Sequence, residues 1–293
     1  MNNIMVTILT PIYNRSIFIL HLYETLIHQE YKKFEWIIVD DGSIDDAGKI
    51  IKGIIDKSPF PIKYIKKENG GKHTAINYGV KEANGELVLI LDSDDTLPTD
   101  SLINITQYYE QCRGLNNCAG VCGLMAHHNG KLIGTRFPKD AMYESTLRFR
   151  YKYNVTGDLL EVYKTSVMRE FPFPEIANEK FCPESLVWNR IAGKYKLLCF
   201  NKVIYYRDYL EGGLTSKIVK IRMNSPVASM MTYSEMLIYD IPFKHKMKAA
   251  INYWRFRLCY NGNGGYPKLS GLWNAVAPLG WLMHLKDKRV NKR

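Results

Sequence analysis

The chain has 293 residues, of which 46% are hydrophobic, 12% aromatic and 24% charged. This composition supplies the core of one large α/β domain with an appendage, or of two modest domains, and it excludes a disordered or fibrous protein. The formal net charge is +11, and residues 217–293 carry all of it, with 14 Lys and Arg against three Asp and Glu. Such a basic segment is expected to bind an anionic partner, either nucleic acid or an anionic lipid surface.

The cysteines and the chain start both point to the cytoplasm. The six cysteines form no Cys-x-x-Cys pair and no zinc-ligand spacing, so we expect reduced thiols in a reducing compartment. The first residues show no basic region ahead of an apolar segment, and no run of eighteen apolar residues occurs. We expect neither a secretory signal nor a membrane-spanning helix.

The first hundred residues alternate short strands with helices. Apolar and β-branched runs predict strands over 5–10 (ended by Pro11), 36–39, 62–65 and 87–91, and apolar residues at helical spacing predict helices over 18–29, 47–56 and 73–83. This order predicts a mainly parallel sheet with helices on both faces. Ligands of such sheets bind beyond the carboxyl ends of the strands, where polar or Gly-rich segments follow each run here.

The second half is less regular. We expect a helix over 184–194, a strand over 203–206 and a turn over 211–215 that ends the main domain. Residues 225–239 and 243–258 look helical, and residues 271–285 form an uncharged stretch that Pro278 and Gly280 interrupt.

Three carboxylates follow the fourth predicted strand directly. Asp92 and Asp94 are the outer pair of a D-x-D sequence, and Asp95 comes next. Carboxylates at a strand end form a hard-oxygen site suited to Mg²⁺ or Mn²⁺, ions that proteins commonly hold through one or two carboxylates plus substrate phosphates. A solvated acidic loop is the other interpretation of the motif taken alone.

A second acidic pair, Asp40 and Asp41, ends the second predicted strand and precedes Gly42-Ser43. A carboxylate there could accept hydrogen bonds from a nucleobase imide or a ribose hydroxyl. Turn and helix-capping duty is the alternative, although Asp45 or Asp46 is better placed as the cap, which leaves Asp40 or Asp41 free.

The segment from Glu68 to Gly79 places glycines and Lys72 before a helix. Backbone amides at a helix start and a nearby lysine favour phosphate. The segment matches neither the P-loop nor the dinucleotide fingerprint.

Four sequence elements together resemble the family 2 glycosyltransferases of the GT-A fold. They are Thr10-Pro-Ile-Tyr-Asn-Arg15, Ile38-Val-Asp-Asp-Gly-Ser43, Asn69-Gly-Gly-Lys-His-Thr-Ala-Ile-Asn77 and Gly85-Glu-Leu-Val-Leu-Ile-Leu-Asp-Ser-Asp-Asp95. The resemblance is close over residues 4–105 and looser over 106–216. It implies a catalytic GT-A domain over 1–216, with a nucleotide-sugar-binding half (1–105) and an acceptor-binding half (106–216), followed by a basic helical extension over 217–293.

The resemblance also implies roles for single residues. Asp41 is expected to bind the base, which we expect to be uracil, and Asp94 to ligate Mn²⁺ or Mg²⁺ with Asp92 beside it. The expected nucleotide-sugar-binding residues are Pro11, Tyr13, Asn14, Arg15, Asp41, Gly71, Lys72, Asn77, Asp92 and Ser93.

In this family a carboxylate of the second half acts as the general base. We favour Glu184, because Pro183 positions it at the start of a helix, and Asp158 is the rival base or an acceptor-binding carboxylate. An ordinary helix-start charge is the structural alternative for Glu184. The elements typical of processive polysaccharide synthases are absent, so we expect transfer of a single sugar. The resemblance implies an inverting hexosyltransferase, in which the acceptor hydroxyl attacks from the face opposite the leaving group.

The basic extension suits a membrane surface. Trp273 and Trp281 flank its uncharged stretch, and a cluster of cations follows, as in helices that lie in a membrane interface. Packing against the main domain is the alternative, and nucleic acid is not expected because no binding-fold signature accompanies the charge.

The sequence thus predicts a UDP-sugar-dependent transferase of polysaccharide or cell-surface glycan synthesis. Its expected acceptor is a glycan or a lipid-linked sugar, and its expected place is the cytoplasm, peripheral on the cytosolic face of the membrane. A non-catalytic module that binds a nucleotide or glycan is the competing hypothesis.

Overall fold

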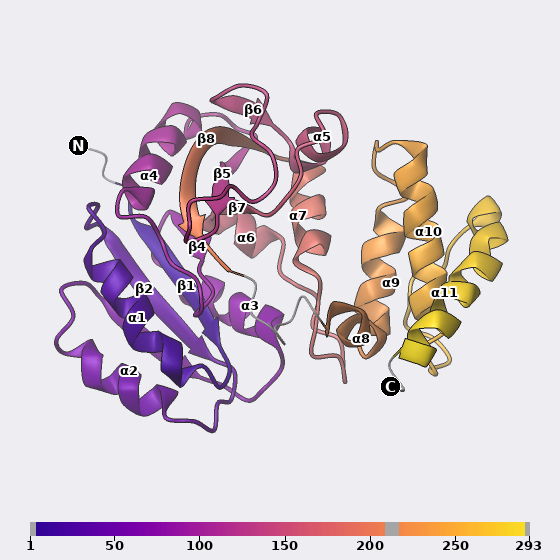
Figure 1. The fold of residues 1–293 in the computed structure, drawn as a ribbon, viewed down its shortest axis with the longest axis horizontal. Helices are drawn as coiled ribbons and strands as arrows, with labels where there is room; N and C mark the ends of the chain where they lie inside the picture. The colour runs from indigo at the N-terminus through magenta and orange to yellow at the C-terminus, as the bar shows by residue number, and fades with distance from the viewer. Residues whose placement is uncertain (1–3, 209–216, 291–293) are drawn as a thin grey trace. The chain divides into compact units, whose positions relative to one another are not determined.

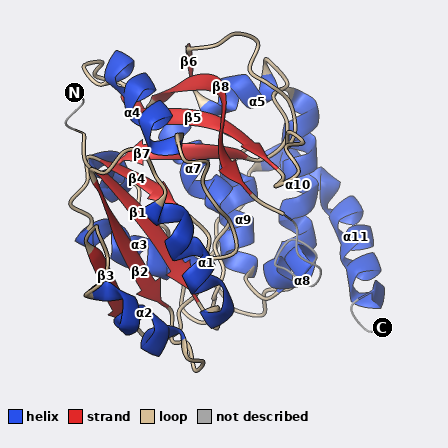
Figure 2. Ribbon diagram, turned by 60° about the vertical axis from the view of Figure 1, so that its left-hand side comes forward, coloured by secondary structure: helices blue, strands red, loops and turns tan. Residues whose placement is uncertain are grey.

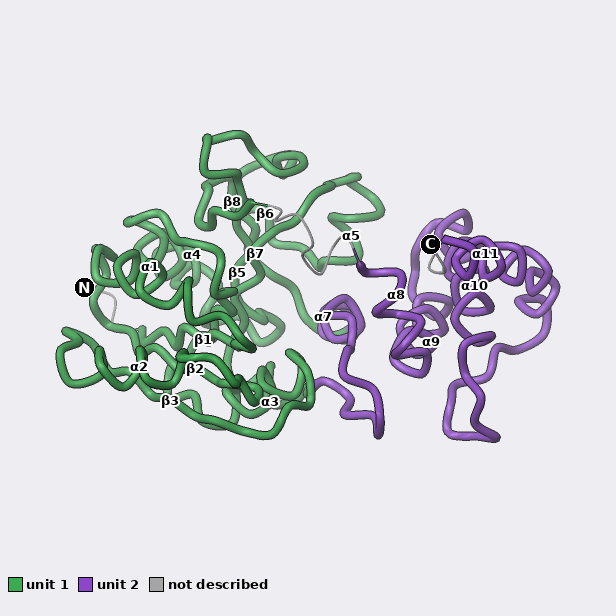
Figure 3. The backbone as a smooth tube through the Cα atoms, turned by 60° about the horizontal axis from the view of Figure 1, so that its bottom comes forward, with its two compact units in different colours: residues 1–172, 194–208 green, residues 173–193, 209–293 purple. Residues whose placement is uncertain are grey.

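A computed structural model describes residues 4–208 and 217–290, which divide into two compact units (Figure 3). Unit 1 comprises residues 1–172 and 194–208, and unit 2 comprises 173–193 and 209–293. Residues 173–193, which sequence analysis groups with the acceptor-binding half, therefore belong to the same unit as the C-terminal helices. The turn expected over 211–215 lies outside the described residues.

Unit 1 is built on a sheet of eight strands within the described residues (Figure 1). The strands are β1 (Val6–Ile12), β2 (Phe34–Asp40), β3 (Ile62–Lys66), β4 (Leu87–Ile90), β5 (Cys118–Ala126), β6 (Met142–Glu144), β7 (Leu159–Lys164) and β8 (Lys196–Tyr206). Their order is β3-β2-β1-β4-β7-β5-β8-β6. The first four strands of this order are parallel to one another, as are β5 and β8, whereas β7 and β6 run antiparallel to their neighbours.

Helices cover both faces of this sheet (Figure 2). The helices of unit 1 are α1 (Ser16–Ile27), α2 (Ala47–Ile55), α3 (Lys72–Glu82), α4 (Ser101–Cys112), α5 (Thr146–Tyr151) and α6 (Thr165–Glu170). Side chains alternate along a strand, so Ile8 joins the core formed with α1, α2 and α4. Its neighbour Leu9 faces α3, where a side chain on Gly79 would collide with it. The predicted α/β fold with a mainly parallel sheet is confirmed.

The registers bring the carboxyl ends of the parallel strands to one edge. Ile12 lies opposite Asp40, and Asp40 lies opposite Lys66. The expectation that Pro11 ends the first strand is wrong, because Pro11 pairs with Val39 inside β1. The pairing with β4 ends at Leu9, so β1 has a single neighbour at this point, where proline is tolerated.

Unit 2 is helical over its described residues. It contains α7 (Glu184–Ala192), α8 (Ile218–Met223), α9 (Pro226–Glu235), α10 (Phe243–Arg257), the 3₁₀ helix η2 (Gly271–Val276) and α11 (Ala277–Val290). Tyr253 of α10 packs in a small core with Val227 and Met230 of α9. On another side of α10, Arg255 binds Asp287 of α11, with 2.7 Å from Nη2 to Oδ1. Across the described residues, no helix combines the length and the apolar character needed to cross a bilayer.

Candidate functional site

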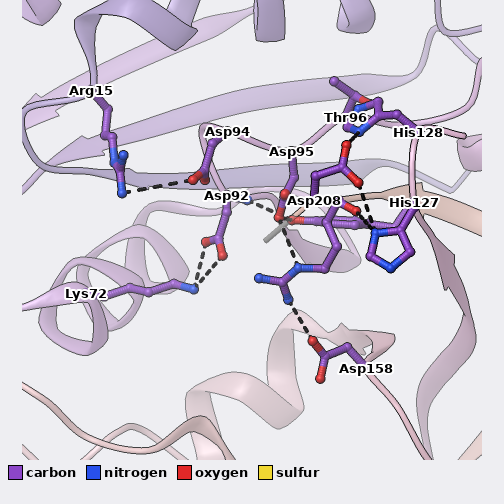
Figure 4. Close-up of polar contacts among 12 residues, drawn as sticks. Arg15, Lys72, Asp92, Asp94, Asp95, Thr96, His127, His128, Asp158 and Asp208 are labelled. Atoms are coloured by element: carbon purple, nitrogen blue, oxygen red, sulfur yellow. Dashed lines mark hydrogen bonds and ion pairs between the residues drawn. The ribbon is translucent and has the colours of Figure 1, made fainter. Parts of the chain in front are cut away.

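Leu91 separates β4 from the D-x-D segment, which lies at the edge where the parallel strands end. Figure 4 shows the side chains of this segment and their polar contacts. The side chains of Asp92 and Asp94 are 28% and 25% exposed, whereas Ser93 and Asp95 are buried. Two carboxylates are therefore accessible to a ligand, and the third is part of the interior.

Asp92 forms a close ion pair with Lys72, the first residue of α3. The Lys72 Nζ lies 2.7 Å from Oδ1 and 3.0 Å from Oδ2 of Asp92. Burial raises the pKa of the Asp92 carboxyl, but the Lys72 ammonium together with the nearby Arg207 and Arg15 charges outweighs burial and holds the pKa below its ordinary value. Asp92 is therefore a carboxylate anion at neutral pH.

Asp94 is held much more loosely. Its one ion pair within the described residues joins Oδ2 to Nη2 of Arg15 at 4.0 Å, and no described residue donates a hydrogen bond to it. Since Mg²⁺ and Mn²⁺ are commonly bound by one or two carboxylates together with substrate phosphates, Asp94 and Asp92 suit such an ion. Over 4–208 and 217–290, no group of three or more His, Cys, Asp or Glu could hold a metal by itself.

Asp95 points into unit 1 instead. It accepts a hydrogen bond of 2.7 Å from the Tyr205 hydroxyl, and Arg207 Nε lies 4.0 Å away. Burial, with a further contribution from the nearby Asp92 charge, raises the pKa of Asp95 to about 7. The Tyr205 hydroxyl also accepts a hydrogen bond of 3.1 Å from the Asp92 amide, so it fixes the backbone of the D-x-D segment.

Arg207, at the end of β8, connects this segment to Asp158. Its Nη1 lies 3.2 Å from Asp158 Oδ2. The structure therefore brings Asp158 near the D-x-D segment through Arg207. Figure 4 labels Asp158 and the three aspartates. Arg207 is not among the residues predicted from the sequence, although its place after the strand predicted over 203–206 was a usable signal.

His127 and His128 belong to a tight turn after β5, in which Gly130 N–H bonds to the His127 carbonyl. Their Nδ1 atoms lie 2.9 and 2.7 Å from the two oxygens of Asp208. His128 Nε2 also lies 2.9 Å from the Thr96 hydroxyl. This turn therefore connects Asp208, just after β8, to Thr96, which follows the three aspartates.

Asp40 and Asp41 are both bound within the protein. Asp40 accepts from the Ser43 amide at 2.7 Å and from the Tyr64 hydroxyl at 2.6 Å. Asp41 is buried and accepts from Lys67 Nζ, Asn69 Nδ2, Gly70 N–H and Gly71 N–H at 2.7 to 3.2 Å. The expectation that one of these carboxylates is free is wrong.

The Gly-rich segment is shaped by Asp41. Gly71 has φ of 99°, a conformation that favours glycine, and precedes α3. The sequence suggested that the amides of Gly70 and Gly71 face a phosphate. They donate hydrogen bonds to Asp41 instead. Lys72 remains the cation of this segment that reaches the D-x-D carboxylates.

The other predicted binding residues lie along the same strand-end edge or beneath it. Tyr13 is half exposed just after β1, and Asn14 joins this turn to the next one through its amide, which donates to Ser43 Oγ at 2.9 Å. Pro11 is buried in β1, and Asn77 is buried in α3. Asp45, one of two predicted caps, accepts from the amides of Ala47 and Ser16 before α2.

Glu184 is the first residue of α7 and belongs to unit 2. Pro183 precedes it in an extended conformation, as the sequence suggested. Only unit 1 residues form the arrangement around Asp92 described above.

Comparison with known proteins gives a family match. The model for "Glycosyl transferase family 2" matches residues 7–170. The minor teichoic acid biosynthesis protein GgaB of Bacillus subtilis is 26% identical over 252 residues, covering 83% of this chain, which spans 27% of GgaB. An uncharacterized glycosyltransferase of Haemophilus influenzae is 25% identical over 274 residues, covering 92% of this chain and the whole of that protein.

Solved structures share the fold. Staphylococcus aureus TarS 1–349 in complex with UDP superposes with a TM-score of 0.63 at 20% identity, covering 97% of this chain and 88% of that chain. The complex of TarS 1–349 with UDP-GlcNAc gives 0.61 at 20% identity, covering 87% and 73%. The mannosyltransferase PcManGT of Pyrobaculum calidifontis, in complex with GDP-Man and Mn²⁺, gives 0.56 at 18% identity, covering 97% and 87%.

Proposed function

Because the chain belongs to glycosyltransferase family 2, we propose that it moves one sugar, with inversion, from a UDP-sugar to a hydroxyl of a glycan or lipid-linked acceptor. The observation that carries the proposal is the convergence of Asp92, Asp94, Lys72 and Arg15 at one strand-end edge. Membership of a transferase family favours this enzyme over a non-catalytic binding module.

The donor proposal rests on the chemistry of that edge. Two accessible carboxylates and two cations match a divalent ion and a diphosphate, which carry the opposite charges. TarS structures contain UDP or UDP-GlcNAc, and the PcManGT structure contains a guanine nucleotide sugar with Mn²⁺. We propose UDP as the nucleotide here, with Tyr13 and Asn14 beside the base.

Asp94 and Asp92 are the residues that would hold Mn²⁺ or Mg²⁺. When bound, such an ion supplies charge neutralisation to the diphosphate as it leaves. Lys72 and Arg15 stabilise the same developing negative charge from the protein side. Asp41 fixes the loop that presents Lys72, and a base that bonds to Asp41 has to replace one of its present donors.

Glu184 is the proposed general base. Its carboxylate takes the proton of the acceptor hydroxyl as that oxygen attacks the anomeric carbon from the face opposite the diphosphate, which inverts the configuration. Asp158, which binds Arg207, is the rival. We propose Asp158 as an acceptor-binding carboxylate.

The acceptor is proposed to lie at a membrane. GgaB is named for minor teichoic acid biosynthesis, which favours a cell-surface polymer as the class of acceptor. In unit 2, α11 buries Gly280, His284 and Asp287, and it leaves Trp281 and Leu282 about half exposed. Lys286, Lys288 and Arg289 follow directly and are exposed. Exposed apolar side chains next to cations suit a cytosolic anionic leaflet.

A thermal-shift screen of nucleotide sugars tests the donor proposal. A ligand that binds the folded state raises its apparent stability, by about 2.7 kcal/mol at 100 times Kd. UDP-sugars are expected to raise the Tm in the presence of Mn²⁺ and much less in excess chelator. Equal shifts from GDP-, CDP- and UDP-sugars would contradict the choice of UDP.

A further inference from the structure

Each carboxylate of the D-x-D segment faces a cation from a different part of unit 1. Lys72, at the first turn of α3, contacts both oxygens of Asp92 at 2.7 and 3.0 Å. Arg15, just before α1, lies 4.0 Å from Asp94. All four side chains are between 25% and 35% exposed, so the two ion pairs lie within reach of a ligand.

Lys72 occupies both oxygens of Asp92, which a divalent ion would need, and Arg15 faces Asp94 from 4.0 Å. An ion arriving alone has to displace Lys72 from Asp92 or settle beside its ammonium, and repulsion between like charges opposes both. A diphosphate arriving alone gains Lys72 and Arg15 but meets the negative charges of Asp92 and Asp94. Each ligand by itself therefore meets charges of its own sign.

Arrival of both ligands removes this conflict. The carboxylates exchange the lysine and the arginine for the divalent ion, and the two released cations bind the diphosphate. Every charge then has a partner of opposite sign, and none is left uncompensated in a partly buried site.

We propose that Lys72, assisted by Arg15, is a replaceable counterion that keeps the D-x-D carboxylates from binding a divalent ion until a nucleoside diphosphate arrives. Binding of the ion and of the nucleotide is then mutually dependent, and linkage requires each to strengthen the other by the same factor. The inference rests on the proposed function, because it assumes that both ligands bind at this edge.

Mn²⁺ titrations followed by the electron paramagnetic resonance signal of the free ion test the proposal, with and without UDP. In the wild-type chain, UDP is expected to tighten Mn²⁺ binding at least about tenfold, within the usual range of coupling between sites. The Lys72→Met variant keeps an unbranched side chain that is one atom shorter and removes its charge. It is expected to bind Mn²⁺ alone about three- to tenfold more tightly and UDP more weakly, with a smaller coupling factor.

Two further variants sharpen the test. Arg15→Met is expected to act in the same direction with a smaller effect, because its ion pair is longer, 4.0 Å against 2.7 Å. Lys81→Met removes an exposed lysine from the last turn of the same helix and is expected to leave both affinities unchanged. Thermal unfolding of each variant shows whether it is folded.

Opposite effects on the two ligands separate a counterion from a structural lysine. A Lys72→Met chain that is folded and binds Mn²⁺ alone no better than the wild type overturns the counterion role and leaves the proposed function standing. A wild-type chain that binds UDP but binds Mn²⁺ in neither condition overturns the metal-dependent function, and this inference with it.

Discussion

The carboxylates at the strand-end edge differ in how many hydrogen bonds and ion pairs the protein supplies to each. Asp41 accepts four hydrogen bonds, which fills the acceptor capacity of a carboxylate. Asp92 has the Lys72 ammonium, and Asp94 has only a distant guanidinium within the described part of the chain. The least satisfied carboxylate is therefore the one to which we assign the metal.

Replacing Asp41 tests its role in shaping the Gly-rich loop. In Asp41→Asn an amide nitrogen replaces an acceptor, so at least one buried donor loses its partner. We expect the free energy of unfolding to fall by about 1 to 3 kcal/mol, measured by urea denaturation. Asp46→Asn is the matched control, because Asp46 is exposed and its side chain caps no helix. Equal stabilities of the two variants would show that the Asp41 network contributes nothing.

The assignment of the general base is a second question at this scale. Glu184→Gln preserves shape and removes the proton acceptor, so kcat is expected to fall about 10²- to 10⁴-fold with the KM for the donor little changed. Asp158→Asn is expected to change mainly the KM for the acceptor. Steady-state kinetics of both variants decide between them, and the reverse pattern would make Asp158 the base.

Sequence reasoning found the residues that immediately follow an apolar run. Asp92, Asp94 and Lys72 were predictable because a strand or a helix start is readable next to them. Tyr205 was not, because it reaches the D-x-D segment from within β8 and is 110 positions from its partner Asp95. No local sequence pattern indicates a contact between residues that far apart in the chain.

The predicted bounds of the helices and strands in the first hundred residues lie close to the observed ones, since each element has a clear strand or helix periodicity. Strand β5 was missed because its sequence contains Gly120 and Gly123, which weaken a strand pattern. The structure explains both glycines: a side chain at Gly120 would meet the Val162 carbonyl, and one at Gly123 would meet Ile204 and Phe200. Tertiary packing therefore overrides local propensity here.

Helix α9 offers a prediction at the element scale. Its first amides, of Val227 and Ala228, donate to Glu179 at 2.7 and 2.9 Å, and Glu179 is buried. A carboxylate at a helix N-terminus is favourable, so Glu179→Ala should lower the free energy of unfolding by about 1 to 3 kcal/mol.

The pH dependence of this contact has a definite sign. Burial raises the pKa of Glu179 although the two amides oppose the shift. The folded state therefore binds the proton more tightly than the unfolded state, and the contribution of this group is largest below its ordinary pKa and is lost as the pH rises through the folded value. The stability of the wild type relative to Glu179→Gln is expected to increase as the pH falls from 7 to 4. A difference that is constant or decreases over this range would contradict the raised pKa.

At the scale of the whole molecule, composition predicted where the positive charge lies but not how the chain divides. Residues 173–193 join the C-terminal helices in unit 2. Glu179 and Arg190 connect this segment to α9, and Arg190 Nε bonds to Glu235 at 2.8 Å. The chain passes from unit 1 into unit 2 at residue 173 and returns to unit 1 at residue 194. A single domain boundary placed along the sequence does not describe such a division.

The membrane proposal is tested on the exposed face of α11. Replacing Trp281 and Leu282 together by Ser removes two half-exposed apolar side chains and no charge. Binding to vesicles with phosphatidylglycerol should weaken about tenfold or more, because burying each such side chain is worth about 1.5 to 3 kcal/mol. Ile44→Ser, at an exposed position of unit 1, is the control. Equal sedimentation of both variants with the vesicles would exclude this face as the membrane contact.

The most direct test of the account measures UDP release from UDP-sugars by the wild-type chain and by Asp94→Ala, with Mn²⁺ and in excess chelator. The account predicts turnover by the wild type with Mn²⁺, none in chelator, and a loss of at least about 10²-fold in Asp94→Ala, the order of effect seen when one electrostatic stabiliser of a transition state is removed. Turnover that is the same in chelator and in the variant would contradict the role of the D-x-D carboxylates.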